Sequence, residues 1–295
     1  MYFTGFVDEA APDIDGQIRA VKELGWNQIE SRSIDGKNLH DIPEEKFNEV
    51  ADKLDAAGVH VNCFGSAIGN WAHAITDPFE ITLEEVKRAI PRMKRLDSHL
   101  IRIMSYKPIV ENGPQDQMKE ERFRRLREVT KMFLDNGIQP VHENCMNYGG
   151  MGWPFTLEIL ENVPGLKLVF DTGNCVSNYD RTKPKPWPMQ SSWEFYDHVK
   201  EAVIYIHIKD GVYSHERKDF VCGWAGEGDG NVRQILTDAF SRGYDGGISI
   251  EPHMRVVFHD ASIKADPQAM FDNYVEYGRR IEAMVADIKK ELQRK

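Results

Sequence analysis

The sequence predicts an α/β fold in which eight parallel strands, each followed by a helix, close into one barrel over residues 1–295. Short apolar runs alternate with longer amphipathic segments from one end of the chain to the other. Several amphipathic segments end at a glycine just before the next apolar run, as βα units joined by tight turns require. Eight such units are the number that closes a (β/α)8, or TIM, barrel, and about 250 residues is a typical length for this fold.

The expected strands are short apolar runs that recur along the chain. They cover 3–7, 27–31, 59–64, 99–104, 138–142, 167–171, 203–208 and 247–251. Such nearly continuous hydrophobicity is typical of a parallel sheet that is covered by helices. The alternative is a doubly wound open sheet. It is disfavoured because GFVDEAAPD stands at the end of the first expected strand, in place of a G-x-G-x-x-G loop.

The expected helices lie between these strands. They cover 14–25, 43–57, 79–97, 119–136, 154–162, 191–201 and 231–242, with a long last helix near 267–292. In the first helix, Ile14, Ile18 and Val21 keep the spacing of a buried stripe, and Gly25 is placed to end it. The proline-rich stretch 181–190 is interpreted as a long loop inside the repeat. We expect a homo-oligomer, a dimer or tetramer, with this loop as a candidate contact.

Composition limits the kinds of partner. The chain has 47 Asp and Glu against 37 Lys and Arg, a formal net charge of −10. An acidic chain without a basic cluster is a poor binder of nucleic acid, so no nucleic-acid partner is expected. The four cysteines form no C-x-x-C pair and are typical of reduced thiols. No signal peptide and no membrane-spanning run are recognised, so we expect a cytoplasmic protein without a membrane partner.

Polar side chains mark the ends of the last four expected strands. They are Glu143, Asp171, His207 and Glu251. Because the carboxyl ends of barrel strands meet at one rim, these residues are neighbours around half of it. Any one of them alone is more simply a capped or salt-bridged strand end, but all four together indicate a divalent-metal site. Three carboxylates and one imidazole suit manganese, magnesium or cobalt, with manganese preferred and zinc as a further alternative.

The strand-like run IYIHIKD at 204–210 places two basic residues inside the barrel. Side chains on a strand alternate, so Ile206 and Ile208 fall on one face while Tyr205, His207 and Lys209 fall on the other. A histidine and a lysine on the inner face of an apolar strand are costly to bury without a function. The alternation therefore supports a functional site at this strand end.

Six motifs resemble those of a known family. They are KELGWNQIESRSIDGKNLHDIPEEKFNEVADKLDAAGVHVNCFGSAIG (22–69), HEN (142–144), FDTGN (170–174), HIKD (207–210), GEGDGN (226–231) and IEPH (250–253). In order and spacing they resemble the xylose-isomerase-like TIM barrels, which include sugar (phosphate) isomerases and epimerases. The resemblance covers nearly the whole chain. It implies that one divalent ion is held by Glu143, Asp171, His207 and Glu251, and that the two glutamates act as acid/base groups.

We therefore expect a metal-dependent isomerase or epimerase of a sugar or keto-sugar, keto-glycosides included. A divalent ion bound to a carbonyl and the adjacent hydroxyl acidifies the proton on the intervening carbon and stabilises the enediolate. Glu143 and Glu251, three strands apart on the rim, could approach opposite faces of that carbon.

Three other functions remain open. A lyase or dehydratase would use the same metal-binding residues. An abasic-site endonuclease is less favoured, because such relatives need a three-zinc site with extra histidines and a basic groove. A non-enzymatic sugar-binding module would bind its ligand without a metal.

Four residues are expected to contact the substrate: Asn174, Lys209, Arg217 and Glu227. Lys209 shares the inner face with His207. Asn174 stands where the similar ketose 3-epimerases carry a substrate-binding histidine, so the chain departs from their pattern here. For Arg217 and Glu227 the simpler alternative is a solvated charge in a loop.

Overall fold

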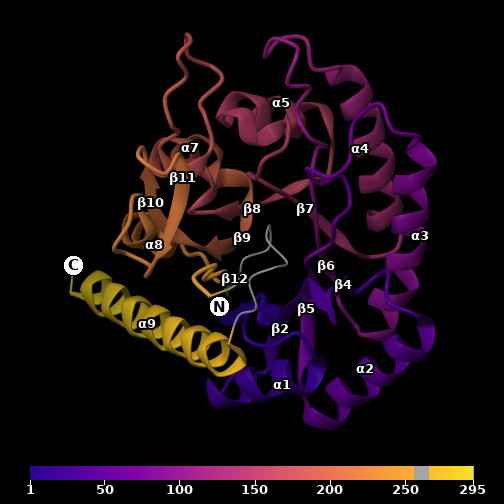
Figure 1. Ribbon diagram of the computed structural model, residues 1–295, viewed down its shortest axis with the longest axis vertical. Helices are drawn as coiled ribbons and strands as arrows, with labels where there is room; N and C mark the ends of the chain where they lie inside the picture. The colour runs from indigo at the N-terminus through magenta and orange to yellow at the C-terminus, as the bar shows by residue number, and fades with distance from the viewer. Residues whose placement is uncertain (256–265, 295) are drawn as a thin grey trace.

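The computed structural model describes residues 1–255 and 266–294 and has the expected barrel (Figure 1). Its main sheet has eight parallel strands in the order β1-β12-β9-β8-β7-β6-β5-β2. The strands are β1 (Tyr2–Gly5), β2 (Gln28–Ser31), β5 (His60–Phe64), β6 (Leu100–Ile103), β7 (Gln139–Glu143), β8 (Lys167–Asp171), β9 (Val203–Ile208) and β12 (Gly247–Ile250). A parallel bridge between Phe6 and Glu30 brings the two edge strands together, so the ring is nearly closed. The predicted TIM-barrel fold is confirmed.

Helices surround the strands (Figure 1). They are α1 (Ile14–Glu23), α2 (Glu44–Ala57), α3 (Phe79–Arg95), α4 (Lys119–Leu134), α5 (Trp153–Asn162), α6 (Asn174–Ser177), α7 (Ser192–Val199), α8 (Val232–Ser241) and α9 (Pro267–Gln293). Short 3-10 helices cover Val7–Glu9, Gly149–Met151 and Lys200–Ala202. The expected long last helix is α9, which packs against α1 and α8.

Local sequence signals set the ends of the first two helices. Asp13 caps α1, because its Oδ1 accepts a hydrogen bond from the backbone N–H of Gly16 at 2.9 Å. Gly25 and Gly58 follow α1 and α2 with φ angles of 71° and 60°. This left-handed region favours glycine, which has no Cβ to clash, so both helices end where the sequence predicts.

The structure adds short elements that the sequence pattern does not predict. They are the hairpin of β3 (Ser33–Ile34) and β4 (Lys37–Asn38), the one-turn helix α6, and the hairpin of β10 (Asp210–Ser214) and β11 (Asp219–Gly223). All of them follow the carboxyl end of a barrel strand. Loops at this end build the site in TIM barrels, so these elements lie where they can shape one.

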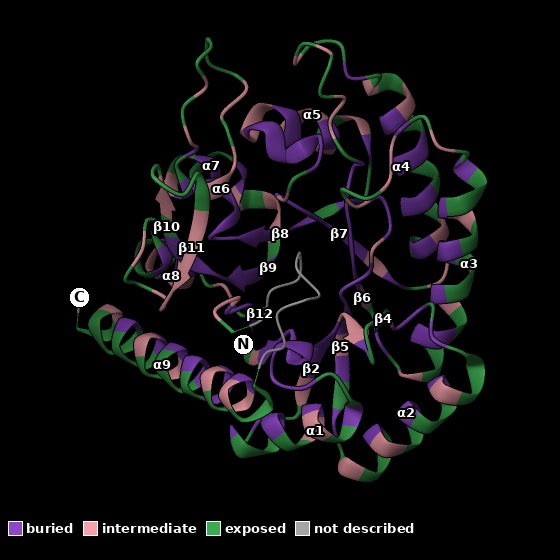
Figure 2. Cartoon of the chain, in the orientation of Figure 1, coloured by how far each residue is buried: buried purple, intermediate pink, exposed green. Residues whose placement is uncertain are grey.

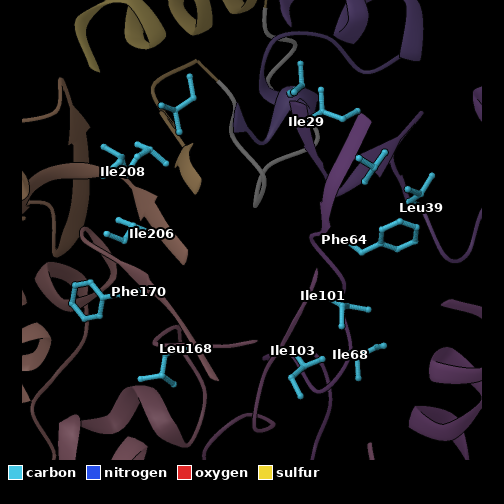
Figure 3. Close-up of a cluster of buried hydrophobic side chains, with 14 of the residues drawn as sticks. Ile29, Leu39, Phe64, Ile68, Ile101, Ile103, Leu168, Phe170, Ile206 and Ile208 are labelled. Carbon is cyan, nitrogen blue, oxygen red and sulfur yellow. The ribbon is translucent and has the colours of Figure 1, made fainter. Parts of the chain in front are cut away.

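Two apolar layers hold the barrel together. The larger one lies between strands and helices and includes Ile206 and Ile208 of β9, both labelled in Figure 3. A smaller one, which includes Val141, Val169 and Tyr205, is separate from it. Ile206 and Ile208 thus belong to one layer and Tyr205 to the other, as the predicted alternation along this strand requires.

Figure 2 shows that burial differs between the barrel strands and the helices. The strands of the barrel are mostly buried, while the helices alternate between buried and exposed residues along their length. Among the residues that the structure describes, no helix combines the length and the apolar character needed to cross a bilayer.

Candidate metal centre

The structure brings together the four polar residues that the sequence analysis placed at strand ends. Glu143 and Asp171 are the last residues of β7 and β8, His207 lies in β9, and Glu251 follows β12 directly. All four are buried, and one donor atom from each lies within 4.8 Å of the others. The barrel thus gathers three carboxylates and an imidazole that are far apart in the sequence.

Each glutamate has one oxygen held by a basic side chain and the other turned toward the cluster. Oε2 of Glu143 accepts a hydrogen bond from Nη1 of Arg102 at 3.1 Å. Oε1 of Glu251 lies 3.0 Å from Nε2 of His253 and accepts a bond from Nη1 of Arg32 at 3.4 Å. The remaining oxygens, Oε1 of Glu143 and Oε2 of Glu251, face the centre.

Asp171 also has one oxygen held by the protein, in this case by backbone N–H groups, and one oxygen that faces the cluster. Its Oδ1 accepts hydrogen bonds from the backbone N–H groups of Gly173 and Asn174, at 2.8 and 2.7 Å. These bonds fix the first turn of α6, which explains this short helix. Its Oδ2 makes no hydrogen bond within the described residues and lies 3.2 Å from Nζ of Lys209.

His207 is oriented by a carboxylate on the far side of its ring. Its Nε2 lies 2.9 Å from Oε2 of Glu30, while its Nδ1 lies 3.3 Å from Oε1 of Glu143 and 3.7 Å from Oε2 of Glu251. Burial lowers the pKa of His207, but Glu30 and Glu143 outweigh burial and raise the pKa to about 10. The ring therefore presents Nδ1 to the cluster, the orientation that metal-binding histidines receive from such partners.

The donor atoms fit a divalent ion. Oδ2 of Asp171 and Oε2 of Glu251 are buried and lack any hydrogen bond within the described chain. A buried carboxylate oxygen without a hydrogen bond is unfavourable, and a cation among the four donor atoms would satisfy both. Three oxygens and one imidazole nitrogen suit a hard or borderline divalent ion.

Burial also strengthens the electrostatic repulsion among the carboxylates of the cluster. It raises the pKa of Asp171 above its usual range, although Lys209 opposes the shift. Burial acts in the same direction on Glu143, but Arg102 and His207 together outweigh it and hold the pKa of Glu143 well below its usual range. A divalent cation would relieve the repulsion that disfavours the charged form of Asp171.

A further ion-pair network surrounds Glu251. Arg32 Nε lies 2.8 Å from Oδ2 of Asp8, and its Nη2 lies 3.3 Å from Oε1 of Glu9. Nδ1 of His253 lies 2.7 Å from the same oxygen of Glu9. Glu9, Glu251 and His253 also bring donor atoms within 4.8 Å of one another. This group shares Glu251 with the four-residue cluster and is part of the same centre.

Two of the four expected substrate-binding residues lie at the centre. Nζ of Lys209 is 3.5 Å from Oε2 of Glu251, and Nδ2 of Asn174 donates to Oε1 of Glu143 at 3.2 Å. The other two are elsewhere. Arg217 is exposed in the turn between β10 and β11, and its backbone N–H donates to Oγ of Ser214.

Glu227 is exposed as well and points toward the outer helix layer. Its Oε1 lies 3.4 Å from Nη1 of Arg280 on α9. For Arg217 and Glu227, contact with a substrate stays a prediction that no interaction with the cluster supports.

The glycine-rich motif that follows β11 is tied to the HIKD motif by one carboxylate. The two oxygens of Asp210 accept hydrogen bonds from the backbone N–H groups of Gly226, Gly228 and Gly230 at 2.7, 3.2 and 2.8 Å. A Cβ on Gly228 or Gly230 would lie 2.4 or 2.7 Å from Oδ1 of Asp210. The two motifs thus form one structural unit beside the centre.

The sequence analysis missed the side chains that hold the metal-binding candidates in place. They are Glu9, Glu30, Arg32 and Arg102, and His253 was assigned no role. Two of them could have been recognised. Arg102 stands between Ile101 and Ile103 of β6, and Glu30 follows Ile29 of β2. A charged residue between apolar residues of a buried strand is costly and indicates a partner inside the barrel.

Comparisons with known proteins agree with the fold. The family model described as xylose isomerase-like TIM barrel matches residues 18–273. A D-tagatose 3-epimerase-like protein has a TM-score of 0.71 at 16% identity, covering 99% of this chain and 100% of that chain. A xylose isomerase-like TIM barrel protein from Mycobacterium smegmatis, solved in complex with magnesium, has a TM-score of 0.67 at 16% identity, covering 96% and 97%.

A third similar structure is the probable 3-DHS dehydratase AsbF, involved in petrobactin synthesis, from Bacillus anthracis. Its TM-score is 0.67 at 16% identity, covering 96% of this chain and 99% of that chain. No curated protein matches the chain in sequence. At this level of identity the similar structures establish the fold alone.

Proposed function

Because the chain belongs to the xylose isomerase-like TIM barrel family, we propose that it is a divalent-metal-dependent isomerase or epimerase of a sugar or keto-sugar, keto-glycosides included. The observation that carries this proposal is the convergence of four buried donor atoms from four separate strand ends. Glu143 ends β7 and Glu251 directly follows β12, and these two strands lie on either side of β8 and β9 in the sheet. They can therefore reach a bound substrate from two directions.

Glu143, Asp171, His207 and Glu251 would hold the ion. Manganese is the proposed identity, with magnesium, cobalt and zinc as alternatives. When bound, such an ion polarises a carbonyl and an adjacent hydroxyl and so acidifies the proton on the intervening carbon. The burial of these residues excludes water and strengthens every charge interaction among them.

The two glutamates are the proposed proton carriers. Oε2 of Glu143 and Oε1 of Glu251 are the oxygens that face away from the centre, bonded to Arg102 and Arg32. A carboxylate oxygen has two lone pairs, so Oε2 of Glu143 can take up a proton while Arg102 stays bound. Oε1 of Glu251, in contrast, would take up a proton in place of its contact with His253. The arginines favour the charged carboxylates, which makes each glutamate ready to return the proton it has taken. Lys209 is the proposed donor to a substrate oxygen.

Hydrogen exchange tests the proposal. We expect keto-sugar products formed in deuterated water to carry deuterium at the carbon next to the carbonyl. Glu143→Gln and Glu251→Gln should each lose roughly 100- to 10,000-fold in rate. Glu161→Gln, an exposed residue of α5, is the control and should keep wild-type activity. A product without solvent-derived label would contradict the proton-transfer mechanism.

A dehydratase or lyase on the same site is the second candidate. It is favoured by the similarity to a probable dehydratase, whose TM-score of 0.67 is close to the 0.71 of the epimerase-like protein. One of the two glutamates would again remove the proton from the carbon next to the carbonyl. A hydroxyl would then leave, and that carbon would not be reprotonated. A product lighter by one water in mass spectrometry would select this function.

Four expectations about the whole protein stay proposals. We propose a small carbohydrate as the substrate and a homo-oligomer as the assembly. The cytoplasmic location and the absence of a nucleic-acid partner also stay predictions from the composition.

A further inference from the structure

A second group of metal-ligand side chains lies outside the centre described above. His40 and Asp41 follow β4, and Glu85 lies on α3. One donor atom from each lies within 4.8 Å of the others. None of the three is among the residues that surround the first centre. We propose that His40, Asp41 and Glu85 form a second metal site that takes zinc or a similar transition-metal ion.

Unsatisfied buried atoms provide the first argument. His40 is fully buried, and neither of its ring nitrogens makes a hydrogen bond within the described residues. Oε2 of Glu85 is buried and also lacks a hydrogen bond there. Nε2 of His40 lies 3.3 Å from Oδ2 of Asp41 as an ion pair, without the geometry of a hydrogen bond. A buried imidazole and a buried carboxylate oxygen are both costly to leave without well-aligned hydrogen bonds. A cation bound by both would remove this cost.

The other carboxylate oxygens are already held, as they are at the first centre. Oδ1 of Asp41 accepts two hydrogen bonds from Arg88, at 2.6 and 3.1 Å. Oε1 of Glu85 lies 3.4 Å from Nε2 of His73. Arg88 and His73 thus leave Oδ2 of Asp41 and Oε2 of Glu85 for an ion. Partners of this kind orient metal ligands in proteins.

The separation of the donor atoms fits zinc. Zinc bonds of about 2.0–2.1 Å in a tetrahedral site place neighbouring ligand atoms roughly 3.3–3.4 Å apart. Nε2 of His40 lies 3.3 Å from Oδ2 of Asp41. These two atoms are at ligand spacing although they make no hydrogen bond of acceptable geometry. One imidazole with two carboxylates leaves a fourth position for water, on the side where Asp41 is 38% exposed.

The site would join two consecutive βα units. His40 and Asp41 belong to the segment between β4 and α2, and Glu85 belongs to α3, so an ion would cross-link this segment to the next helix. An ion that binds only the folded state stabilises it. We expect zinc at 100 times its dissociation constant to raise the melting temperature by about 5 °C or more.

Metal stoichiometry tests the proposal. Purified chain is stripped with a chelator and titrated with zinc by calorimetry, with bound metal measured by elemental analysis. Wild type should bind two equivalents of zinc. His207→Ala, which lacks a ligand of the first centre, should bind one, and His207→Ala/His40→Gln should bind none. His99→Gln is the matched control, because His99 pairs with Asp97 at the surface, and it should bind two equivalents.

A second variant and a spectrum distinguish loss of the metal site from misfolding of the His40 variant. Glu85→Gln in the His207→Ala background should also lose the remaining equivalent. Cobalt added to His207→Ala should give the visible absorption of a four-coordinate site, and the His40 variant should lack it. The proposal would be overturned if His207→Ala bound no zinc. It would also be overturned if zinc binding persisted when His40→Gln and Glu85→Gln were each added to His207→Ala. These binding measurements do not use catalytic activity, so they test the second metal site independently of the proposed function.

Discussion

Oε2 of Glu30 lies 2.9 Å from Nε2 of His207, and both side chains are fully buried inside the barrel. The same oxygen accepts hydrogen bonds from the hydroxyls of Tyr205 and Ser249, at 2.8 and 2.7 Å. Three donors on one oxygen fix the carboxylate firmly. Nε2 of His207 is therefore directed at Glu30 and Nδ1 faces the four-residue cluster, where a bound cation would replace the Nδ1 proton that the raised pKa favours.

Replacing Glu30 should weaken metal binding although Glu30 touches no ion. Glu30→Ala removes the acceptor that orients His207, and we expect a roughly 10- to 100-fold weaker manganese affinity. Glu30→Gln keeps an acceptor oxygen but loses the charge, so it should fall between the alanine variant and wild type. Calorimetric titration measures the affinity, with Glu161→Gln as the unaffected control. Equal affinities in all four proteins would show that Glu30 has no such role.

Asp171 is expected to lower the stability of the metal-free protein and to contribute to metal binding. Its buried charge is unfavourable without a cation, so metal-free Asp171→Asn should melt no lower than metal-free wild type. Manganese at 100 times its dissociation constant should raise the melting temperature of wild type by about 5 °C or more. The variant should lose this rise. Thermal unfolding with and without chelator measures both effects, and a full rise in the variant would count against Asp171 as a ligand.

The loop held by Asp210 should tolerate no side chain at Gly228. A Cβ there would lie 2.4 Å from Oδ1 of Asp210 and 2.4 Å from the backbone oxygen of Gly211. Gly228→Ala should therefore destabilise the protein by about 1–3 kcal/mol. Gly223→Ala in β11 is the matched control, because a Cβ there meets nothing within 4 Å. Urea unfolding compares the two, and equal losses would contradict the steric explanation.

Acid should remove the stabilisation that Glu121 gives to α4. Hydrogen bonds from Arg124 and Arg125 outweigh burial and lower the pKa of Glu121 from 4.5 to about 2. Because the folded pKa lies below the unfolded one, the carboxylate stabilises the fold above pH 4.5. This contribution is lost as the pH falls toward 2.

The corresponding measurement compares variants at two pH values. Since Glu121 is partly exposed, Glu121→Gln should cost no more than about 1 kcal/mol at pH 7 and less at pH 3. Glu120→Gln shares the first turn of α4 without such a pair and should show little change at either pH. A cost that stays constant with pH would mean that the ion pair is not the cause.

Much of the barrel could be predicted because its signals are local. Alternation within β9 separates Ile206 and Ile208 from Tyr205, and the glycines after α1 and α2 end those helices. The gathering of Glu143 and Glu251 followed from one general property of parallel barrels, that strand ends share a rim.

The partners of these residues could not be predicted in the same way. Glu30 and His207 are 177 positions apart, and their contact depends on the barrel bringing β2 and β9 around a common interior. No local pattern encodes that distance. Helix α6 was missed for a related reason, since its first turn is held by Asp171 and not by the propensity of its four residues.

Each carboxylate of the centre has one oxygen held by a protein partner and one that faces the centre, and this arrangement affects the space left for an ion. Three carboxylates and one imidazole are held from behind, so the folded chain fixes the diameter of the cage before any ion enters. Nδ1 of His207 lies 3.3 Å from Oε1 of Glu143 and 3.7 Å from Oε2 of Glu251, so an ion that enters meets a spacing that the folded chain has set. Any preference among cations would in this way arise from the scaffold behind the ligands.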